Sequence, residues 1–354
     1  MFLKFLYPIL LLLITGGCKK VESPFTINLI PISEDITDTS FWKKSNKYII
    51  EKSDFAVTSE LSIQDGTVII IKDGCSITLK DNGHISAQGS ISEPIIFTSQ
   101  YDPEYGNTPN SKLVAPGNWN NIRIESIEKS VFNMCEFYYG GGGESPSTIE
   151  LADSTFVTIT NCTFKNNKGG NLQQICGVIN ASKGLPNTSI RNNILALNSL
   201  PISINSTMNL DNSNIFYDPK TGGSNKYNVV QLNAQTIVDR RVEWLISNVP
   251  ICVFGSKLIL AKTASVFWGN HSVLKFDKDA EMRIECDTTR LINSDGPGVT
   301  FTSYTDDLSI SDSNGDGISS LPKAGDWKGI TDSTGRFYRW KNIKYSSIET
   351  SIIK

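Results

Sequence analysis

Short β-forming runs separated by turn dipeptides recur along the chain from about Tyr48, and this rhythm constrains the fold more than any other feature. "TVIII" ends at Asp73-Gly74 and "SITLK" ends at Asn82-Gly83, and each run lasts about five to eight residues. Such spacing is typical of a sandwich, a barrel or a β-solenoid. Asn, Ser, Thr, Ile and Gly are abundant and long stretches of helical period are missing. The sequence therefore predicts an all-β protein.

The middle of the chain repeats itself at about the length of one solenoid coil. The segments "FNMCEFYYGG" (132–141), "ITNCTFKNNKG" (159–169) and "IRNNILALNSL" (190–200) share one pattern. Equivalent residues fall in two columns, one of Cys135, Cys162 and Asn193 and the other of Phe137, Phe164 and Leu195. A coil this thin cannot bury its apolar side alone, so neighbouring coils must stack and place like residues over like. The repeat favours a parallel β-helix.

Asparagines recur at the turn-like positions of these segments. Asn161 and Asn192 occupy one such position, and Asn167 and Asn198 occupy another. Stacked coils allow each buried side-chain amide to hydrogen-bond with the one above it. We therefore expect asparagine ladders with a structural role.

A longer duplication overlies the short repeat. Residues 97–122 and 301–330 both begin with Phe-Thr-Ser, carry a polar loop and close with Gly-Asn-Trp or Gly-Asp-Trp. Upstream, Trp42 corresponds to Trp244, and "LSIQDG" to "LILAKT". We therefore expect a first module at 41–228 and a second, truncated module at 229–354 that continues it. The last coil would leave an unpaired edge that needs a cap or a partner.

The first eighteen residues are typical of an export signal. Lys4 precedes an apolar run at 5–14 that is too short to span a bilayer. Thr15-Gly16-Gly17 before Cys18 resembles a bacterial lipobox, which implies a signal peptide at 1–17 and a lipid on the Cys18 sulfur. Residues 18–40 are predicted to tether the domain to the membrane. The expected location is the bacterial cell envelope; we take the outer membrane, although the sequence after Cys18 does not itself distinguish the two membranes.

The net charge argues against a nucleic-acid partner, and the cysteine and histidine content argues against a zinc cluster. A formal net charge of −3 and a pI of about 5.6 leave no electrostatic footprint for nucleic acid. The six other cysteines form no CxxC pair and only two histidines exist, which excludes a zinc cluster. Their apolar, strand-like surroundings indicate buried free thiols. His84 lies in a strand pattern and His271 in a turn pattern, and neither has a nucleophile motif nearby.

The order of these segments resembles the right-handed parallel β-helix repeat proteins of the pectin-lyase-like superfamily. More narrowly, it is similar to their surface-lipoprotein and adhesin-like members in Gram-negative bacteria. "SITLKDNGHISAQGS", "PIIFTS", "GNWNNI" and coils of the "ITNCTF" kind carry the resemblance, which covers roughly residues 41–350. It implies an all-β, right-handed parallel β-helix with three-strand coils. It implies little about activity, because the superfamily includes lyases, hydrolases, adhesins and passive scaffolds.

The hexapeptide "DSNGDG" (312–317) is the stretch most suggestive of a metal site. Calcium takes six to eight oxygens, which we expect from Asp312, Asn314 and Asp316, with Asp306 or Asp307 completing the shell. An EF-hand is excluded, because Lys323 stands where the bidentate glutamate is required. The equivalent loop of the first module lacks this element. Calcium is therefore a possible cofactor, and an ion-free Asp/Asn/Gly turn is the alternative.

The repeated coils offer few groups for catalysis. Carboxylates are scattered over them without an Asp-Asp pair, and Arg191 and Lys165 are interpreted as solvated side chains. We therefore assign no catalytic residues. Trp119 and Trp327 hold matching places in both modules and are expected in the core. The aromatic residues expected to stack on sugar rings are Tyr101, Tyr105, Tyr138 and Tyr139.

These observations predict a lipid-anchored cell-envelope protein with a non-enzymatic role in surface binding or adhesion. Carbohydrate is the favoured ligand, because a solenoid offers a long face on which exposed aromatics can contact a polysaccharide; a surface protein is the other possible partner. A polysaccharide lyase or glycoside hydrolase on the same scaffold is the first alternative. A passive structural scaffold is the second.

Overall fold

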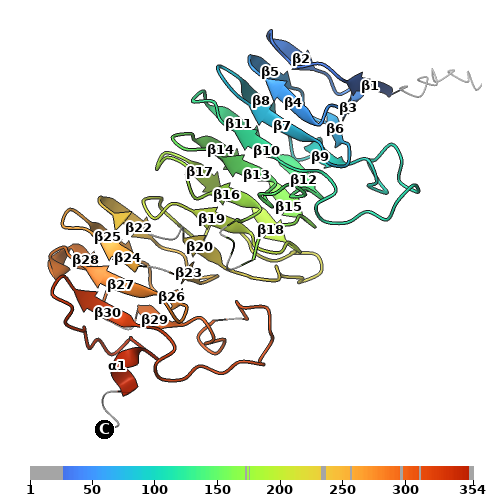
Figure 1. The fold of residues 1–354 in the computed structure, drawn as a ribbon. Coiled ribbons are helices and arrows are strands. Elements are labelled where there is room, and N and C mark those ends of the chain that lie inside the picture. Colours follow the sequence, from blue (N-terminus) through green and yellow to red (C-terminus); the bar gives the residue numbers. More distant parts are fainter. Residues whose placement is uncertain are drawn as a thin grey trace, which may run out of the picture.

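The chain winds into a right-handed parallel β-helix, as the sequence predicted. The computed structural model describes residues 27–171, 174, 176–232, 237–255, 257–295, 298–310 and 312–350. Each coil contributes strands to parallel sheets that run along the long axis of the molecule (Figure 1). Within the described residues, helix is confined to η1 (Thr288–Arg290) and α1 (Ser347–Thr350). Neither has the length and hydropathy needed to cross a membrane.

The first module is built from three sheets. In spatial order, sheet A comprises β1 (Asn28–Ile32), β3 (Asn46–Ile50), β6 (Val68–Ile71), β9 (Ile95–Ser99), β12 (Cys135–Tyr138), β15 (Thr163–Lys165) and β18 (Ile194–Ala196). Sheet C comprises β2 (Ser40–Trp42), β5 (Glu60–Ile63), β8 (His84–Gln88), β11 (Ser130–Asn133), β14 (Val157–Thr160) and β17 (Ser189–Arg191).

Sheet B runs through both modules. It comprises β4 (Asp54–Val57), β7 (Ser76–Leu79), β10 (Ile122–Ile124), β13 (Ile149–Leu151), β16 (Ile179–Ala181), β19 (Ile202–Ile204), β20 (Val230–Leu232), β23 (Ile251–Val253), β26 (Ser272–Phe276) and β29 (Val299–Ser303). Two further sheets complete the second module. Sheet D contains β22 (Arg241–Trp244), β25 (Ser265–Trp268) and β28 (Leu291–Ile292); sheet E contains β21 (Ile237–Val238), β24 (Lys257–Leu260), β27 (Glu281–Ile284) and β30 (Gly329–Asp332).

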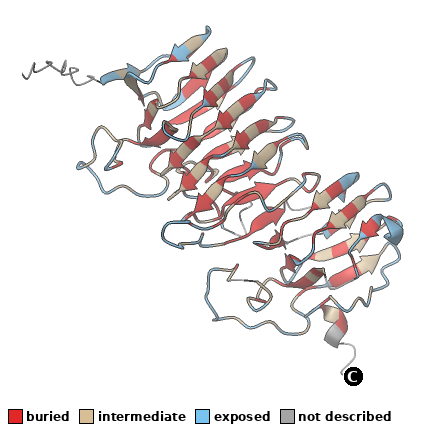
Figure 2. Cartoon of the chain, turned by 180° about the vertical axis from the view of Figure 1, so that it is seen from behind, coloured by how far each residue is buried: buried red, intermediate tan, exposed pale blue. Residues whose placement is uncertain are grey.

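The core consists of columns of like side chains inside the coils, which appear as buried stripes in Figure 2. The predicted columns are confirmed, because Phe137 is in register with Phe164 and Phe164 with Leu195. Phe137 stacks on Phe97 with ring centroids 4.8 Å apart and on Phe164 at 4.5 Å. Parallel pairing in register produces these ladders, since each side chain lies over its equivalent in the next coil. All six cysteines of the described residues are free and buried, as expected.

One predicted asparagine ladder forms and the other does not. Asn167 donates from Nδ2 to Asn198 Oδ1 at 3.2 Å, and Asn198 donates to Asn225 Oδ1 at 3.1 Å, all three being buried. Asn161 and Asn192 are instead exposed and adopt left-handed backbone angles, with φ of 56° and 57°. They turn the corner without building a buried ladder, because asparagine tolerates this conformation better than most residues.

The duplication corresponds to a repeated strand order. Trp42 in β2 and Trp244 in β22 hold equivalent places, and so do the Phe-Thr-Ser ends of β9 and β29. By the same order β5 is equivalent to β25, so the predicted match of "LSIQDG" with "LILAKT", which lies in β24, is displaced by one strand. Sheets A, B and C of the first module thus correspond to sheets B, E and D of the second.

The chain forms the two ends of the helix in different ways. At the amino end, β1 pairs with β3 along its whole length, so residues 28–32 of the predicted tether belong to the first coil. At the carboxyl end, Tyr338 and Trp340 pack against the core, and Ile343 forms a bridge with Phe301. Residues 336–350 therefore cover the last coil and protect its edge.

Candidate functional site

A cleft opens where sheet C ends. Strand β17 is the last member of this sheet, and the next coil crosses the same side of the helix with only a single bridge, from Leu210 to Trp244 of β22. The strand-to-strand contact that would seal the wall is therefore missing between β17 and this crossing segment. The resulting cavity has a volume of about 330 Å³. We call it the junction cleft, because it lies between the sheets of the two modules.

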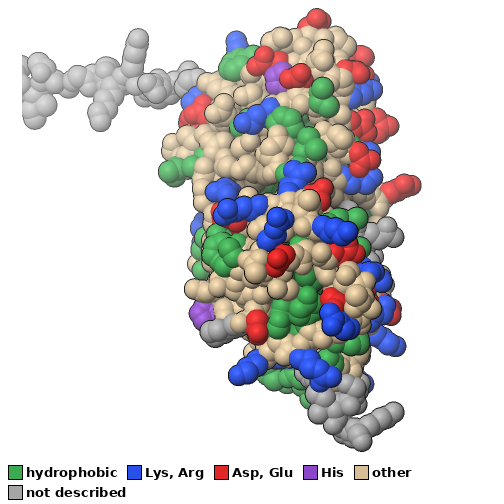
Figure 3. Space-filling model, turned by 90° about the vertical axis from the view of Figure 1, so that its left-hand side faces the viewer, with side chains coloured by type: hydrophobic (Ala, Val, Ile, Leu, Met, Phe, Trp, Pro, Cys, Tyr) green, Lys and Arg blue, Asp and Glu red, His purple; other side chains and the backbone are tan. Residues whose placement is uncertain are grey.

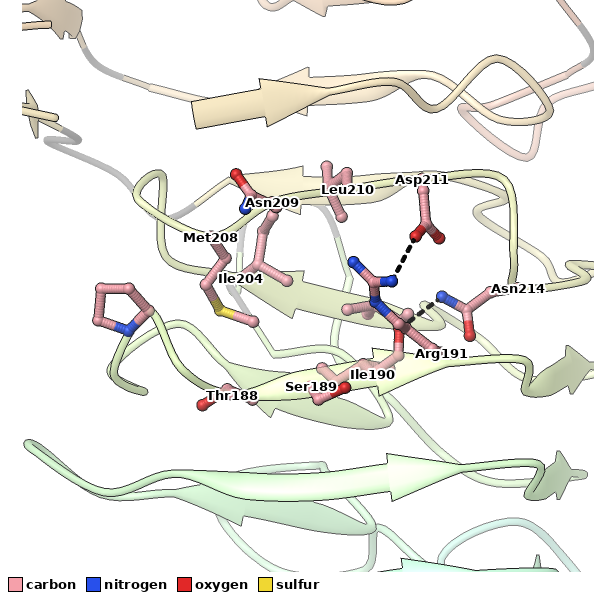
Figure 4. A pocket seen from close by; sticks show the side chains of 12 residues that line it. Thr188, Ser189, Ile190, Arg191, Ile204, Met208, Asn209, Leu210, Asp211 and Asn214 are labelled. Carbon is pink, nitrogen blue, oxygen red and sulfur yellow. Dashed lines mark hydrogen bonds and ion pairs between the residues drawn. The ribbon is translucent and has the colours of Figure 1, made fainter. Parts of the chain in front are cut away.

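The junction cleft combines an apolar floor with a polar rim (Figure 4). Ile204 and Met208 are buried and lie at the bottom. The Arg191 guanidinium reaches across the opening to the Asp211 carboxylate, 3.4 Å away. Both ends of this ion pair are accessible, with side-chain exposures of 57% and 29%.

Two further polar groups define the walls of the cleft. Asn214 donates to the carbonyl oxygen of Ile190 at 2.8 Å and so ties the crossing segment to β17. Thr188 lines the cavity, and its buried Oγ1 has no hydrogen-bond partner among the described residues. The cleft thus presents an ion pair over an apolar base.

The side of the helix that carries sheets C and D is rich in basic groups. Figure 3 shows Lys and Arg side chains gathered across the middle of this side, among fewer acidic ones. Arg241 begins β22 and pairs with Glu243, whose backbone N–H donates to Asn209 at the cleft. A ligand with some negative charge is therefore favoured here.

The structure brings three of the four predicted tyrosines together. Tyr138 and Tyr139 have ring centroids 6.2 Å apart, and Tyr105 of the first insert (residues 100–121) lies close enough to influence the pKa of Tyr138. Burial, followed by the hydrogen bond to Glu136, raises the pKa of Tyr138, which donates to this carboxylate at 2.6 Å. All three rings are half-buried. Tyr101 instead lies beneath the Lys112 ammonium and donates to Asp73.

The second insert (residues 304–328) brings three of the five predicted calcium ligands together. Carboxylate oxygens of Asp307, Asp312 and Asp316 lie within 4.8 Å of one another. Asp306 faces elsewhere, because it is buried and accepts hydrogen bonds from Thr302 and Ser309. Asn314 is engaged within the turn, accepting from the backbone of Asp316 and donating to Ser320.

A buried lysine lies beside this cluster. Lys275 of β26 is fully buried, and its Nζ donates to Ser313 and lies 3.5 Å from Asp307 Oδ1. Burial raises the pKa of the Asp307 carboxyl, against the lowering by the Ser313 backbone N–H and Lys275. Lys275 was not predicted from the sequence, although a lysine within the apolar run "SVLKF" was the available signal.

The remaining predicted site residues have structural roles or lie outside the described residues. Trp119 and Trp327 are fully buried, as expected, and their indole N–H groups donate to backbone carbonyls. Arg191, interpreted from sequence as a solvated side chain, is exposed but forms the rim of the junction cleft. Asp211 was missed, and only the loss of the coil pattern after residue 204 signalled it. Cys18 lies outside the described residues.

No protein-family model matches the chain, and neither a curated protein nor a solved structure gives a significant match to it. The parallel β-helix is therefore established by the arrangement of the strands alone.

Proposed function

We propose that this protein is a non-enzymatic carbohydrate-binding protein of the bacterial cell envelope, and that the junction cleft holds the sugar. The observation that carries the proposal is the composition of the cleft, in which Ile204 and Met208 lie below the Arg191–Asp211 pair. A sugar ring has an apolar face of C–H groups and a periphery of hydroxyls. Apolar surfaces with a few convergent polar groups are typical of binding sites for such ligands.

The polar rim matches the hydrogen-bonding needs of a saccharide. Arg191 offers several N–H donors in one plane and Asp211 offers acceptors, so adjacent hydroxyls can bind to both. The basic character of this side of the helix favours an acidic polysaccharide over a neutral one.

Binding is preferred to catalysis because the cleft lacks a pair of acid–base groups. Asp211 is the only carboxylate among the residues that line it, and it is engaged by Arg191. Glycoside hydrolysis requires two carboxyl groups on opposite sides of the scissile bond. A lyase or hydrolase remains the alternative function and a passive scaffold the second, and the experiment below separates all three.

The test is a glycan array that includes acidic polysaccharides, followed by calorimetry on the purified protein. We expect saturable binding that Arg191→Gln and Asp211→Asn each weaken about tenfold to a hundredfold, the loss of a charged hydrogen bond. Arg241→Gln is the matched control, because Arg241 is exposed nearby and lies outside the cleft lining. New unsaturated or reducing ends in the polysaccharide would instead identify an enzyme. Absence of binding to any glycan would favour a scaffold.

The tyrosine cluster (Tyr105, Tyr138 and Tyr139) is the second candidate for sugar contact. Its half-buried rings lie beside the Glu136 carboxylate on the outer side of sheet A, an arrangement suited to stacking and hydrogen bonding. If Tyr139→Ala abolishes glycan binding while Arg191→Gln does not, the sugar binds at the cluster. Binding that survives both changes would exclude both surfaces.

We also propose that Cys18 carries a lipid that holds the protein on the envelope, in the outer membrane. The supporting feature is the Thr-Gly-Gly-Cys sequence after a short apolar run. Cys18→Ser should abolish incorporation of radiolabelled fatty acid and release the protein from the membrane fraction. Retention of the label by that variant would exclude this attachment site.

A further inference from the structure

We propose that the second insert binds a calcium ion between Asp307, Asp312 and Asp316. The three carboxylates converge within 4.8 Å, and all three come from one loop after β29. Carboxylate oxygens are the ligands that calcium prefers, with water completing its shell of six to eight oxygens. The inference is independent of the carbohydrate-binding proposal, since none of these residues lines the junction cleft.

A buried oxygen without a partner points to a ligand at this place. The Asp307 side chain is only 9% exposed, and its Oδ2 has no hydrogen-bond partner among the described residues. Its other oxygen, Oδ1, faces Lys275 and the backbone N–H of Ser313. A carboxylate oxygen removed from water and left without a partner is costly, and a bound cation would satisfy it.

The charge of the site suits a divalent ion. Three carboxylates and the Lys275 ammonium leave two negative charges. Lys275 is fully buried beside Asp307, so its ammonium offsets one carboxylate and the other two remain to be balanced. A single Ca²⁺ supplies the required charge.

The loop is shaped so that the half-buried Asp312 carboxylate keeps its position. Asp312 accepts the backbone N–H groups of Gly315 and Gly317, each at 2.8 Å. Gly315 has φ of 73°, and a Cβ there would lie 2.9 Å from the Lys226 carbonyl oxygen, so only glycine allows this packing. The loop is thereby fixed against the last coil of the first module. Calcium binding would need little further ordering of the chain.

The first insert lacks every element of this site. Ile70 occupies the place of Lys275, because both are in register with the threonine of the Phe-Thr-Ser strand. Pro103 follows Asp102 where Asp307 follows Asp306. Asp102 and Asp306 have the same role in both inserts, since each accepts a hydrogen bond from that threonine. The acidic cluster is therefore an addition to the second insert and is not required to close a loop of this kind.

The experiment titrates the purified, chelator-treated protein with CaCl₂ by calorimetry and with Tb³⁺ by sensitised luminescence. Tyr227 packs against Gly315 and is placed to sensitise the lanthanide. We expect one ion per chain, with a dissociation constant on the order of 10⁻⁴–10⁻³ M, as in extracellular calcium modules. Calcium should also protect the second insert, and not the first, from limited proteolysis.

Variants identify the ligands without removing the buried ion pair. Asp312→Asn and Asp316→Asn should each weaken calcium binding by at least about tenfold, and the melting temperature of the exposed Asp316→Asn variant without calcium should match that of the wild type. Asp153→Asn is the control, since that carboxylate is 81% exposed in the first module. No saturable binding up to about 10 mM, well above the expected range, or unchanged affinity in both variants would overturn the proposal.

Discussion

The two inserts begin alike and are stabilised differently. Each follows a Phe-Thr-Ser strand whose threonine donates to an aspartate four residues on, Thr98 to Asp102 at 2.5 Å and Thr302 to Asp306 at 2.7 Å. The first covers the outer side of sheet A over the buried residues Ile49 and Ile70. The second covers the outer side of sheet B over Cys252 and Lys275.

This difference shows how a duplicated β-helix module can gain a site without losing its fold. The internal columns of both modules are apolar apart from the asparagine ladders of the first module, and the outward-facing side chains under the inserts do not belong to these columns. The outward-facing side chains of a strand that an insert covers must either be apolar or have hydrogen-bond and charge partners. In the first module isoleucine meets this need, and in the second a lysine meets it through Asp307 and Ser313. Beneath the inserts, Cys252 and Lys275 of the second module take the places of Ile49 and Ile70 of the first.

The largest expected effect comes from breaking the buried ion pair of the second insert. Asp307→Ala leaves the Lys275 ammonium buried without its carboxylate, which should reduce the free energy of unfolding by about 3–5 kcal/mol. The double variant Lys275→Ile with Asp307→Ala reproduces the apolar arrangement beneath the first insert. It should recover most of the free energy of unfolding that the single variant loses. Urea unfolding of the two variants and the wild type, without calcium, measures both quantities.

The matched control for this pair is Asp316→Ala, which removes an exposed carboxylate of the same loop that does not pair with Lys275. It should change the unfolding free energy by less than about 1 kcal/mol in the absence of calcium. A cost below about 1 kcal/mol for Asp307→Ala, or a double variant as unstable as the single one, would contradict the comparison between the inserts.

The aspartate that the inserts share should have similar effects in both. Asp102→Ala and Asp306→Ala each remove a buried acceptor from a strand threonine, and each should cost about 1.5–3 kcal/mol. Thermal or urea unfolding of the two single variants and of the double variant provides the measurement. The inserts are far apart, so the two losses should add. A loss in only one insert would show that the two closures are not equivalent.

The comparison extends to the corners of the first module, where asparagines replace apolar packing. Asn198→Ala removes a side chain that donates to Phe164 O and Asn225 Oδ1 and accepts from Asn167, at a cost of about 2 kcal/mol. The exposed Asn187→Ala is the control and should be near neutral. Hydrogen exchange should locate the loss in the coils around β15 and β18. Equal effects of the two substitutions would deny the ladder a role in stability.

The sequence predicted the interior of the helix better than its surface. The columns of Phe137 and Cys135 were recognisable from the sequence, because in-register stacking requires a similar side chain at the same position of each coil. The amino-acid sequence therefore repeats at the length of one coil. Free buried cysteines and buried Trp119 and Trp327 followed from the same reasoning. The displaced match of "LSIQDG" arose because strands of adjacent sheets are similar in length and composition.

The surface sites depend on contacts that local sequence does not record. Asp306 and Asp307 are neighbours of identical type, and only the path of the loop turns one toward Thr302 and the other toward Lys275. The junction cleft exists because a strand is missing after β17, and its rim pairs Arg191 with a residue twenty positions away in the next coil. An absent strand leaves no motif, which is why Asp211 was not predicted.

The smallest effect concerns a second ion pair, between Lys165 and Asp218 on the outer side of sheet A, which is also largely buried, with side-chain exposures of 19% and 5%. Lys165 donates to Asp218 at 2.9 Å, and this bond, with the backbone N–H of Lys220, lowers the pKa of Asp218 to about 2. An aspartate in the unfolded chain titrates near 3.9. Asp218 therefore stabilises the fold above about pH 4, and this contribution is lost as the pH falls from about 4 to 2.

Asp218→Asn should remove up to one proton from the pH dependence of unfolding in that window, measured by urea unfolding at several pH values. Asp153→Asn, on an exposed carboxylate, should leave the dependence unchanged, and an acid limb that persists in Asp218→Asn would assign it to other carboxylates.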